Sequence, residues 1–184
     1  MKYLKKYLNL FRPDKIEDLC YKFGISNFQI VDGLVNVDDS VYLGSRNLKK
    51  IPIKFGTVTG DFHCCTNPII SLEGSPHTVG GSFLCDGCKL TSLKGGPKSV
   101  GRHFKCEANN LTSLEGSPNS VGRLFMCDDN KLTSLNGSPN SVGGNFSCRK
   151  NISAHLCEHE NLKRREILKE IHGVDNLSYL DLYI

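Results

Sequence analysis

The sequence predicts a short solenoid, an α+β repeat protein with a parallel β ribbon, a non-helical convex side and caps at both ends. Three observations predict it. A 21-residue interval recurs through the middle of the 184-residue chain. Gly and Pro occupy fixed positions in this interval and leave too little length for a full helix beside a strand. Helical and hairpin patterns flank the repeated region, where a solenoid needs its exposed core covered.

The repeat is defined by two ladders of side chains that recur without a slip. The phenylalanines are Phe62, Phe83, Phe104, Phe125 and Phe146, and the cysteines two positions later are Cys64, Cys85, Cys106, Cys127 and Cys148. Alternation over Phe-x-Cys is typical of a short strand that turns both residues inward. Val41 and Leu43 stand one interval before Phe62 and Cys64, so we expect about five coils over residues 37–153.

The repeat resembles a known family. F-x-C-x-x-N-x-L is similar to the leucine-rich-repeat core L-x-x-L-x-L-x-x-N/C-x-L, with Phe and Cys in place of the strand leucines. More narrowly, it resembles leucine-rich-repeat proteins of tailed bacteriophages and environmental bacteria. The resemblance implies a right-handed solenoid and a cytoplasmic, phage-encoded protein, and it implies no reaction. It also implies that one ladder bonds its side chains to the backbone of adjacent coils: Asn67, Asn109, Asn130 and Asn151, with Cys88 as a substitute.

Residues 1–36 are predicted to form the N-terminal cap. Ile16, Leu19, Cys20 and Phe23 have helical spacing. We expect Asp14 as the N-cap residue of that helix and Gly24 at its end. A hairpin should follow, with residues 28–31 and 34–37 joined at Asp32-Gly33. Residues 1–12 suggest a second short helix that covers the cap, or alternatively a membrane-surface anchor.

Residues 154–184 are predicted to form a C-terminal helical cap and an apolar tail. The helix is expected over residues 156–172. The tail, which is rich in Leu and Tyr, is expected to dock on the cap or on another chain, which makes a homo-oligomer possible.

Composition and motifs exclude several function classes. The net charge is only +4, whereas a nucleic-acid binder usually concentrates more positive charge. No apolar run approaches the roughly 20 residues of a membrane span, which excludes a transmembrane protein. No catalytic motif is present, so we expect no catalytic residues, no cofactor and no enzyme activity. Cys85 and Cys88 have the C-x-x-C spacing of zinc sites, and His155 and His159 stand four residues apart. We nevertheless expect no metal, because an apolar interior raises the pKa of a thiol and disfavours the thiolate.

The nine cysteines should be reduced, because the count is odd and the start of the sequence does not have the pattern of an export signal. Thiol titration of the denatured, unreduced protein is therefore expected to find nearly nine free groups.

The residues that flank the inward ladders form the candidate binding face, because they vary while the ladders do not. The candidate partner-binding residues are His63, Leu84, Lys105, Met126, Ser147, His103, Leu124, Glu107 and Asp128. Leu84, Leu124 and Met126 are expected to form an apolar anchor inside a polar rim. These features favour a non-catalytic protein-binding module that acts on a host, defence or phage protein. The alternative is a nucleic-acid-associated protein that uses Lys49, Lys50, Lys54, Lys98, Arg102 and Arg123.

Overall fold

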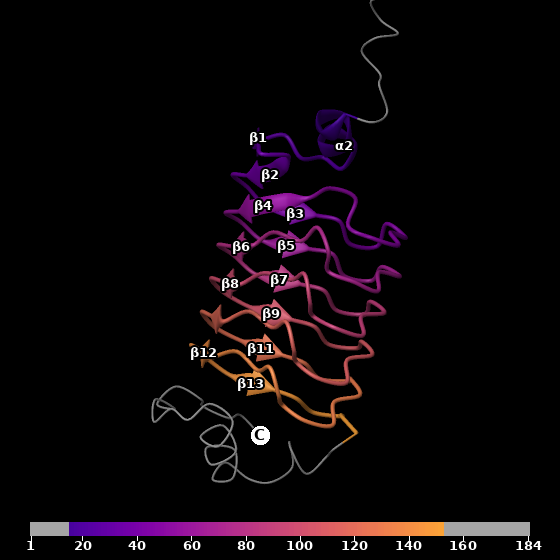
Figure 1. Cartoon of the computed structure of the whole chain (residues 1–184), viewed down its shortest axis with the longest axis vertical. Helices are drawn as coiled ribbons and strands as arrows, with labels where there is room; N and C mark the ends of the chain where they lie inside the picture. The colour runs from indigo at the N-terminus through magenta and orange to yellow at the C-terminus, as the bar shows by residue number, and fades with distance from the viewer. Residues whose placement is uncertain (1–14, 153–184) are drawn as a thin grey trace, which may run out of the picture.

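The computed structural model describes residues 15–152 and shows a parallel β-solenoid of about five turns with one short helix. The coils stack along the long axis of Figure 1, from the N-terminal cap to the last coil. Within residues 15–152, no helix has the length and apolar character that crossing a bilayer requires. The helices predicted over residues 1–12 and 156–172 lie outside the described residues.

Helix α2 (Ile16–Lys22) begins the described chain. Cys20 is buried, and Ile16, Leu19 and Phe23 pack against the core, which agrees with the predicted helical face. Gly24 follows in the left-handed conformation (φ 76°) that ends helices. The predicted N-cap at Asp14 is wrong. Lys15 is the N-cap residue, because it has the extended backbone of that position, and it forms no side-chain cap hydrogen bond.

The predicted hairpin is confirmed. Strand β1 (Phe28–Val31) pairs antiparallel with β2 (Leu34–Val37) through a turn in which Asp32 and Gly33 both have positive φ, 52° and 74°. Such a turn matches the twist of the two strands. On its other side β2 pairs in parallel with β4 (Phe55–Val58), so the hairpin is joined directly to the solenoid.

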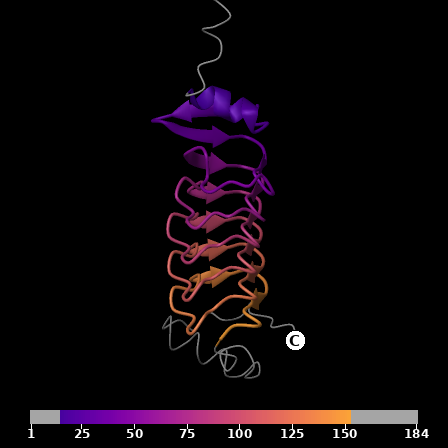
Figure 2. The same cartoon turned by 90° about the vertical axis from the view of Figure 1, so that its right-hand side faces the viewer.

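Two parallel ribbons run along the solenoid. The six-stranded sheet contains β3 (Val41–Tyr42), β5 (Phe62–His63), β7 (Phe83–Leu84), β9 (Phe104–Lys105), β11 (Phe125–Met126) and β13 (Phe146–Ser147). The seven-stranded sheet contains β1, β2, β4, β6 (Thr78–Val79), β8 (Ser99–Val100), β10 (Ser120–Val121) and β12 (Ser141–Val142). Figure 2 shows the strands of successive coils one below another.

The expectation of a single ribbon is therefore incomplete. The valine that precedes Phe by four residues belongs to a second strand, which pairs with the same valine of the next coil, as Val100 does with Val121. Coils of equal length bring these dipeptides together in register, although each strand has only two residues. The described part of each coil contains no helix, as predicted for the convex side.

The core lies between the two ribbons. Four of the ladder phenylalanines have no exposed surface, and Phe146 is 5 % exposed. Neighbouring rings stack with centroids 5.1–5.4 Å apart and planes within 14° of parallel. The ladder cysteines are buried beside them. The interior is therefore a continuous column of rings and thiols.

The asparagine ladder joins successive coils. Asn109 is buried, and its Nδ2 donates to the carbonyls of Cys85 (3.0 Å) and Cys106 (3.1 Å), while its Oδ1 accepts from the N–H of Leu90 (3.0 Å). Where Cys88 replaces asparagine, its Sγ donates to the carbonyl of Cys64 at 3.4 Å. This is the coil-to-coil role that the resemblance implies for the ladder.

Candidate binding face

The six-stranded sheet turns one row of side chains outward. In each strand the first residue points into the core and the next points out, because successive side chains alternate. The parallel register places these outward residues beside one another from coil to coil. They form the central row: Tyr42, His63, Leu84, Lys105, Met126 and Ser147. The surface that contains this row and its two margins is called the strand face.

All nine predicted binding residues lie half-buried on the strand face. Sequence reasoning missed Tyr42, although the positions of Val41 and Leu43 in the repeat provided the signal. Tyr42 is 56 % exposed, and its ring centroid lies 4.9 Å from that of His63. The face therefore has an aromatic pair near its N-terminal end.

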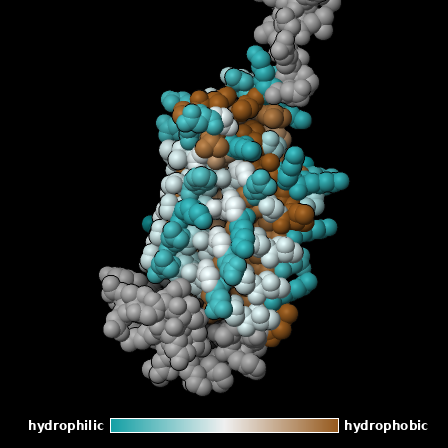
Figure 3. Space-filling model, viewed as in Figure 1, coloured by the Kyte–Doolittle hydropathy of each residue, from teal (hydrophilic) through white to brown (hydrophobic). Residues whose placement is uncertain are grey.

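The predicted apolar anchor divides into two parts. Leu124 and Met126 flank the inward Phe125 and face outward together, whereas Leu84 lies two coils away with Lys105 between it and Met126. The expectation of one three-residue apolar group is therefore corrected. Apart from Tyr42, the large apolar side chains that are most exposed lie outside the strand face. Tyr21 and Val31, for example, belong to the N-terminal cap, where apolar surface gathers in Figure 3.

One margin of the strand face is basic. His103 precedes β9, and its pKa is lowered by burial and then by the nearby cations Arg102, Arg123 and Lys105. A lowered pKa keeps the imidazole neutral at pH 7, because the ordinary value is already about 6.5. The two guanidinium groups therefore carry the positive charge of this margin, and Asp61, two coils before His103, adds one negative charge.

The opposite margin is acidic and consists of Asp86, Glu107 and Asp128 on successive coils. Burial raises the pKa of Asp86. Burial also raises the pKa of Glu107, and the carboxylates of Asp86 and Asp128 raise it further. None of the three forms an ion pair within 4.0 Å among the described residues. The margin therefore presents negative charge, and Lys105 of the central row offsets part of it at Asp86 and Glu107.

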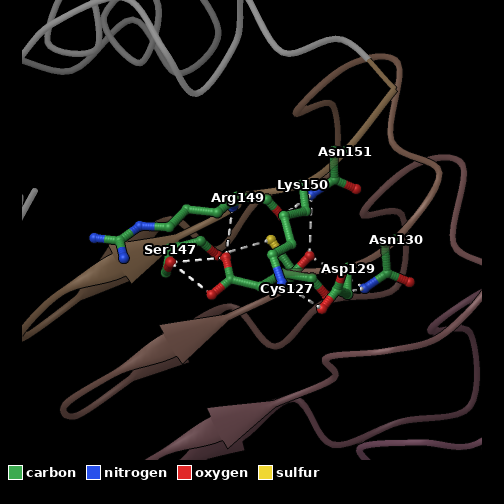
Figure 4. Close-up of polar contacts among 8 residues, drawn as sticks. Cys127, Asp129, Asn130, Ser147, Arg149, Lys150 and Asn151 are labelled. Atoms are coloured by element: carbon green, nitrogen blue, oxygen red, sulfur yellow. Dashed lines mark hydrogen bonds and ion pairs between the residues drawn. The ribbon is translucent and has the colours of Figure 1, made fainter.

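Backbone and hydroxyl groups hold this margin in place. The N–H of Glu107 donates to Asp86 Oδ1 (3.0 Å), and Ser147 Oγ donates to both oxygens of Asp128 (2.7 and 2.9 Å). Figure 4 shows the same region at the last two coils, where Lys150 also pairs with Asp129 at 3.5 Å. The carboxylates of Asp86 and Asp128 are thus positioned by the coil that follows each of them.

A second polar contact lies near the first coils. His63 Nε2 lies 3.9 Å from Asp61 Oδ2, and Asp61 Oδ1 accepts the N–H of Ser82 at 2.6 Å. Asp61 is therefore oriented by the backbone of the next coil, and the imidazole of His63 is close to both Asp61 and the Tyr42 ring.

The thiols are protonated and largely inaccessible. Burial raises the pKa of Cys64, Cys85 and Cys106 well above the usual range, and it raises the pKa of Cys65, at the edge of the strand face, to about 11. Thiols in this state are weak nucleophiles and poor metal ligands. Within residues 15–152, no three His, Cys, Asp or Glu side chains are grouped so as to hold a metal ion.

The prediction of reduced cysteines needs one correction. Among the described residues, seven cysteines keep their thiol groups: Cys20, Cys64, Cys65, Cys85, Cys88, Cys106 and Cys127. Cys148, in contrast, is disulfide-bonded. Sequence reasoning excluded a disulfide between stacked ladder cysteines, because their Cα–Cβ bonds run parallel and their Cβ atoms stay too far apart. That argument still holds for the ladder cysteines that keep their thiol groups. It does not apply to a residue of the last coil, which has no ladder cysteine beyond it.

No protein-family model, curated protein or solved structure matches this chain. The chemistry of the strand face is therefore the basis for assigning a function.

Proposed function

We propose that this protein is a non-catalytic module that binds another protein through the strand face. One observation carries the proposal: the face combines a basic margin, an acidic margin and a half-buried central row with apolar and aromatic members on one regular sheet. Protein interfaces have this composition, with aromatic or apolar anchors inside a polar rim. The outward side chains differ from coil to coil, whereas the inward ladders repeat.

The two margins provide orientation. Arg102 and Arg123 lie on one side of the central row, and Asp86, Glu107 and Asp128 lie on the other. A partner with the opposite arrangement of charge is attracted in one orientation and repelled in the reversed one. Complementary charge of this kind increases the association rate and the specificity more than it increases the affinity.

The resemblance supplies the remaining parts of the proposal. The asparagine ladder and the motif F-x-C-x-x-N-x-L support a right-handed solenoid of the leucine-rich-repeat type. The similarity to phage sequences supports a phage-encoded protein that acts in the host cytoplasm on a host or defence protein. A homo-oligomer through the apolar C-terminus remains an expectation, because that segment lies outside the described residues.

The test is affinity capture from infected cells with identification by mass spectrometry, followed by titration with the purified partner. Met126→Asp and Leu84→Asp should each raise the dissociation constant about thirtyfold or more, as expected for a central anchor. Thr112→Asp is the matched control, because Thr112 is exposed on the loop side of the solenoid and should keep the affinity. Unchanged affinity in both strand-face variants would contradict the proposal.

Nucleic acid is the weaker alternative. Arg102 and Arg123 lie on neighbouring coils, joined by a 2.8 Å backbone hydrogen bond, and are the one pair among the six candidates that stacks from coil to coil. The other four belong to different parts of the coil: Lys49 and Lys50 lie in the loop before β4, Lys54 directly precedes β4, and Lys98 directly precedes β8. Two phosphate contacts predict a logarithmic salt slope of only about −2. A much steeper slope would favour nucleic acid over a protein partner.

A further inference from the structure

A polar pocket lies on the seven-stranded sheet, away from the strand face. It has a volume of about 290 Å³ and is formed where the hairpin joins the first coil. Its lining residues come from β1, β2 and β4 and the segments beside them: Asn27, Phe28, Gln29, Asn36, Val37, Asp38, Thr57 and Thr59. None of them is Lys, Arg or His.

An irregularity in strand pairing shapes this pocket. Val35 pairs with Phe55, but Val37 pairs with Val58, so β4 has one residue more than β2 over this stretch. The extra residue lets the Asn36 side chain lie over Gly56, where an added Cβ would meet Asn36 Oδ1 at 2.3 Å. Asn36 Oδ1 accepts from both the N–H and the hydroxyl of Thr57, each at 2.9 Å. The amide is therefore fixed, and its NH₂ group remains available.

The other wall is equally well fixed. Asn27 and Asp38 exchange two hydrogen bonds, from the Asn27 side chain to the Asp38 carbonyl (2.8 Å) and from the Asp38 N–H to the Asn27 carbonyl (3.0 Å). Thr59 Oγ1 donates to Asp38 Oδ1 at 3.0 Å. These bonds leave Asp38 Oδ2, Asn27 Oδ1 and the whole amide of Gln29 as unused hydrogen-bonding groups.

The pocket coincides with departures from the repeat. At the position of Asn36, the later coils have only Thr or Ser, and at the position of Thr59 they have only Gly. The later glycines are required by sterics. A Cβ at Gly101, for instance, would lie 2.0 Å from the carbonyl oxygen of Gly80. The larger polar side chains are thus concentrated where the structure has a pocket.

We propose that this pocket binds one unit of a neutral carbohydrate. Sugar hydroxyls both donate and accept, which matches the amide and carboxylate groups of this lining. Those of Asn27, Asn36 and Asp38 are held in place in advance by hydrogen bonds within the protein. The absence of cationic lining residues disfavours phosphate or carboxylate ligands, and the polar lining disfavours lipids. The volume lies at the lower end for ligand pockets, which fits a single ring.

The test is an NMR titration of the ¹⁵N-labelled full chain with glucose, galactose, mannose and N-acetylglucosamine, with glucose 6-phosphate as the anionic comparison. At least one neutral sugar should give saturable shifts of the Gln29 and Asn36 side-chain amides. The dissociation constant should be about a millimolar, as expected for a ligand of this size. Gln29→Ala should weaken binding about five- to tenfold, the effect of one lost hydrogen bond.

A second variant and a control sharpen the result. Asn36→Ser introduces the residue of later coils and should abolish saturation, whereas Ser120→Ala, on the same sheet but far from the pocket, should leave binding unchanged. If Asn36→Ser fails to fold, Gln29→Ala is the deciding variant, because its exposed side chain forms no hydrogen bond within the described structure. The proposal is overturned if no neutral sugar gives saturable shifts, if glucose 6-phosphate binds more tightly, or if Gln29→Ala binds like the parent.

Discussion

The continuous column of phenylalanine rings makes Phe104→Ala the most informative substitution. Phe104 has no exposed surface and stacks between Phe83, at 5.4 Å, and Phe125, at 5.2 Å. Truncation of a buried phenylalanine costs about 3–5 kcal/mol of unfolding free energy. Each ring contact is worth roughly 0.5–1.5 kcal/mol, and two are lost here, so we expect a value near the upper half of that range.

Equilibrium unfolding in urea measures this loss. Far-UV circular dichroism and tyrosine fluorescence should give coincident transitions, because a solenoid unfolds as one unit only while its coils remain coupled. A loss of about 4 kcal/mol is a large fraction of the 5–15 kcal/mol that stabilises an ordinary domain. The midpoint should therefore fall strongly while the slope of free energy against urea stays constant.

Two control substitutions distinguish the loss of ring packing in the column from a general loss of stability on substitution. Phe104→Leu keeps most of the volume and should cost less than about 1.5 kcal/mol. Tyr42→Ala removes an aromatic ring from the outer side of the same sheet, where it is 56 % exposed, and should cost about 0.5 kcal/mol or less. A loss below about 1 kcal/mol for Phe104→Ala, with an unchanged slope, would refute the packing of the column.

Three further substitutions or conditions test other parts of the fold. Asn109→Ala should lower the free energy of unfolding in urea by about 1–3 kcal/mol, because the buried N–H of Leu90 loses its acceptor. Asn109→Cys should lower it by less, and equal losses for the two variants would contradict the role of the asparagine ladder. Gly122→Ala should lower the free energy of unfolding by about 3 kcal/mol, because an added Cβ would lie 2.0 Å from a carbonyl oxygen of the preceding coil. If the melting temperature falls no more than for an ordinary surface substitution, the two coils do not approach this closely. The free energy of unfolding should decrease above about pH 9, because burial raises the pKa of Cys85 and Cys106 and keeps both thiols protonated in the folded state, while the unfolded chain ionises them. Each thiol then lowers this free energy by about 1.4 kcal/mol per pH unit. Urea midpoints that stay constant from pH 8 to 10 would contradict the burial of these thiols.

Much of the strand face was predictable because the repeat imposes the same geometry on every coil. Once Phe125 is assigned to the core, alternation places Leu124 and Met126 outside it. The margins were harder to anticipate. That Arg102 and Arg123 both influence His103 depends on how the turn between the two ribbons is folded, and side-chain alternation along a strand does not predict the shape of a turn.

The second ribbon shows the limit of local patterns. A dipeptide such as Ser99-Val100 between Pro97 and Gly101 has the composition of a turn, and two residues are too few to show alternation. Its strand character comes from pairing with the coils on either side. The polar pocket has a similar origin, because it depends on one extra residue in β4 opposite β2.

The amino-acid sequence alone determined the solenoid, the inward ladders, the hairpin at Asp32-Gly33 and the outward position of the candidate binding residues. These features follow from a repeated interval and from side-chain alternation, which are local properties of a chain. Only the tertiary structure decided the second sheet, the separation of Leu84 from the pair formed by Leu124 and Met126, the disulfide of Cys148 and the pocket beside Asn36. Each of these depends on how segments distant in the chain meet in space, and the free energy of such contacts is not encoded in any single repeat.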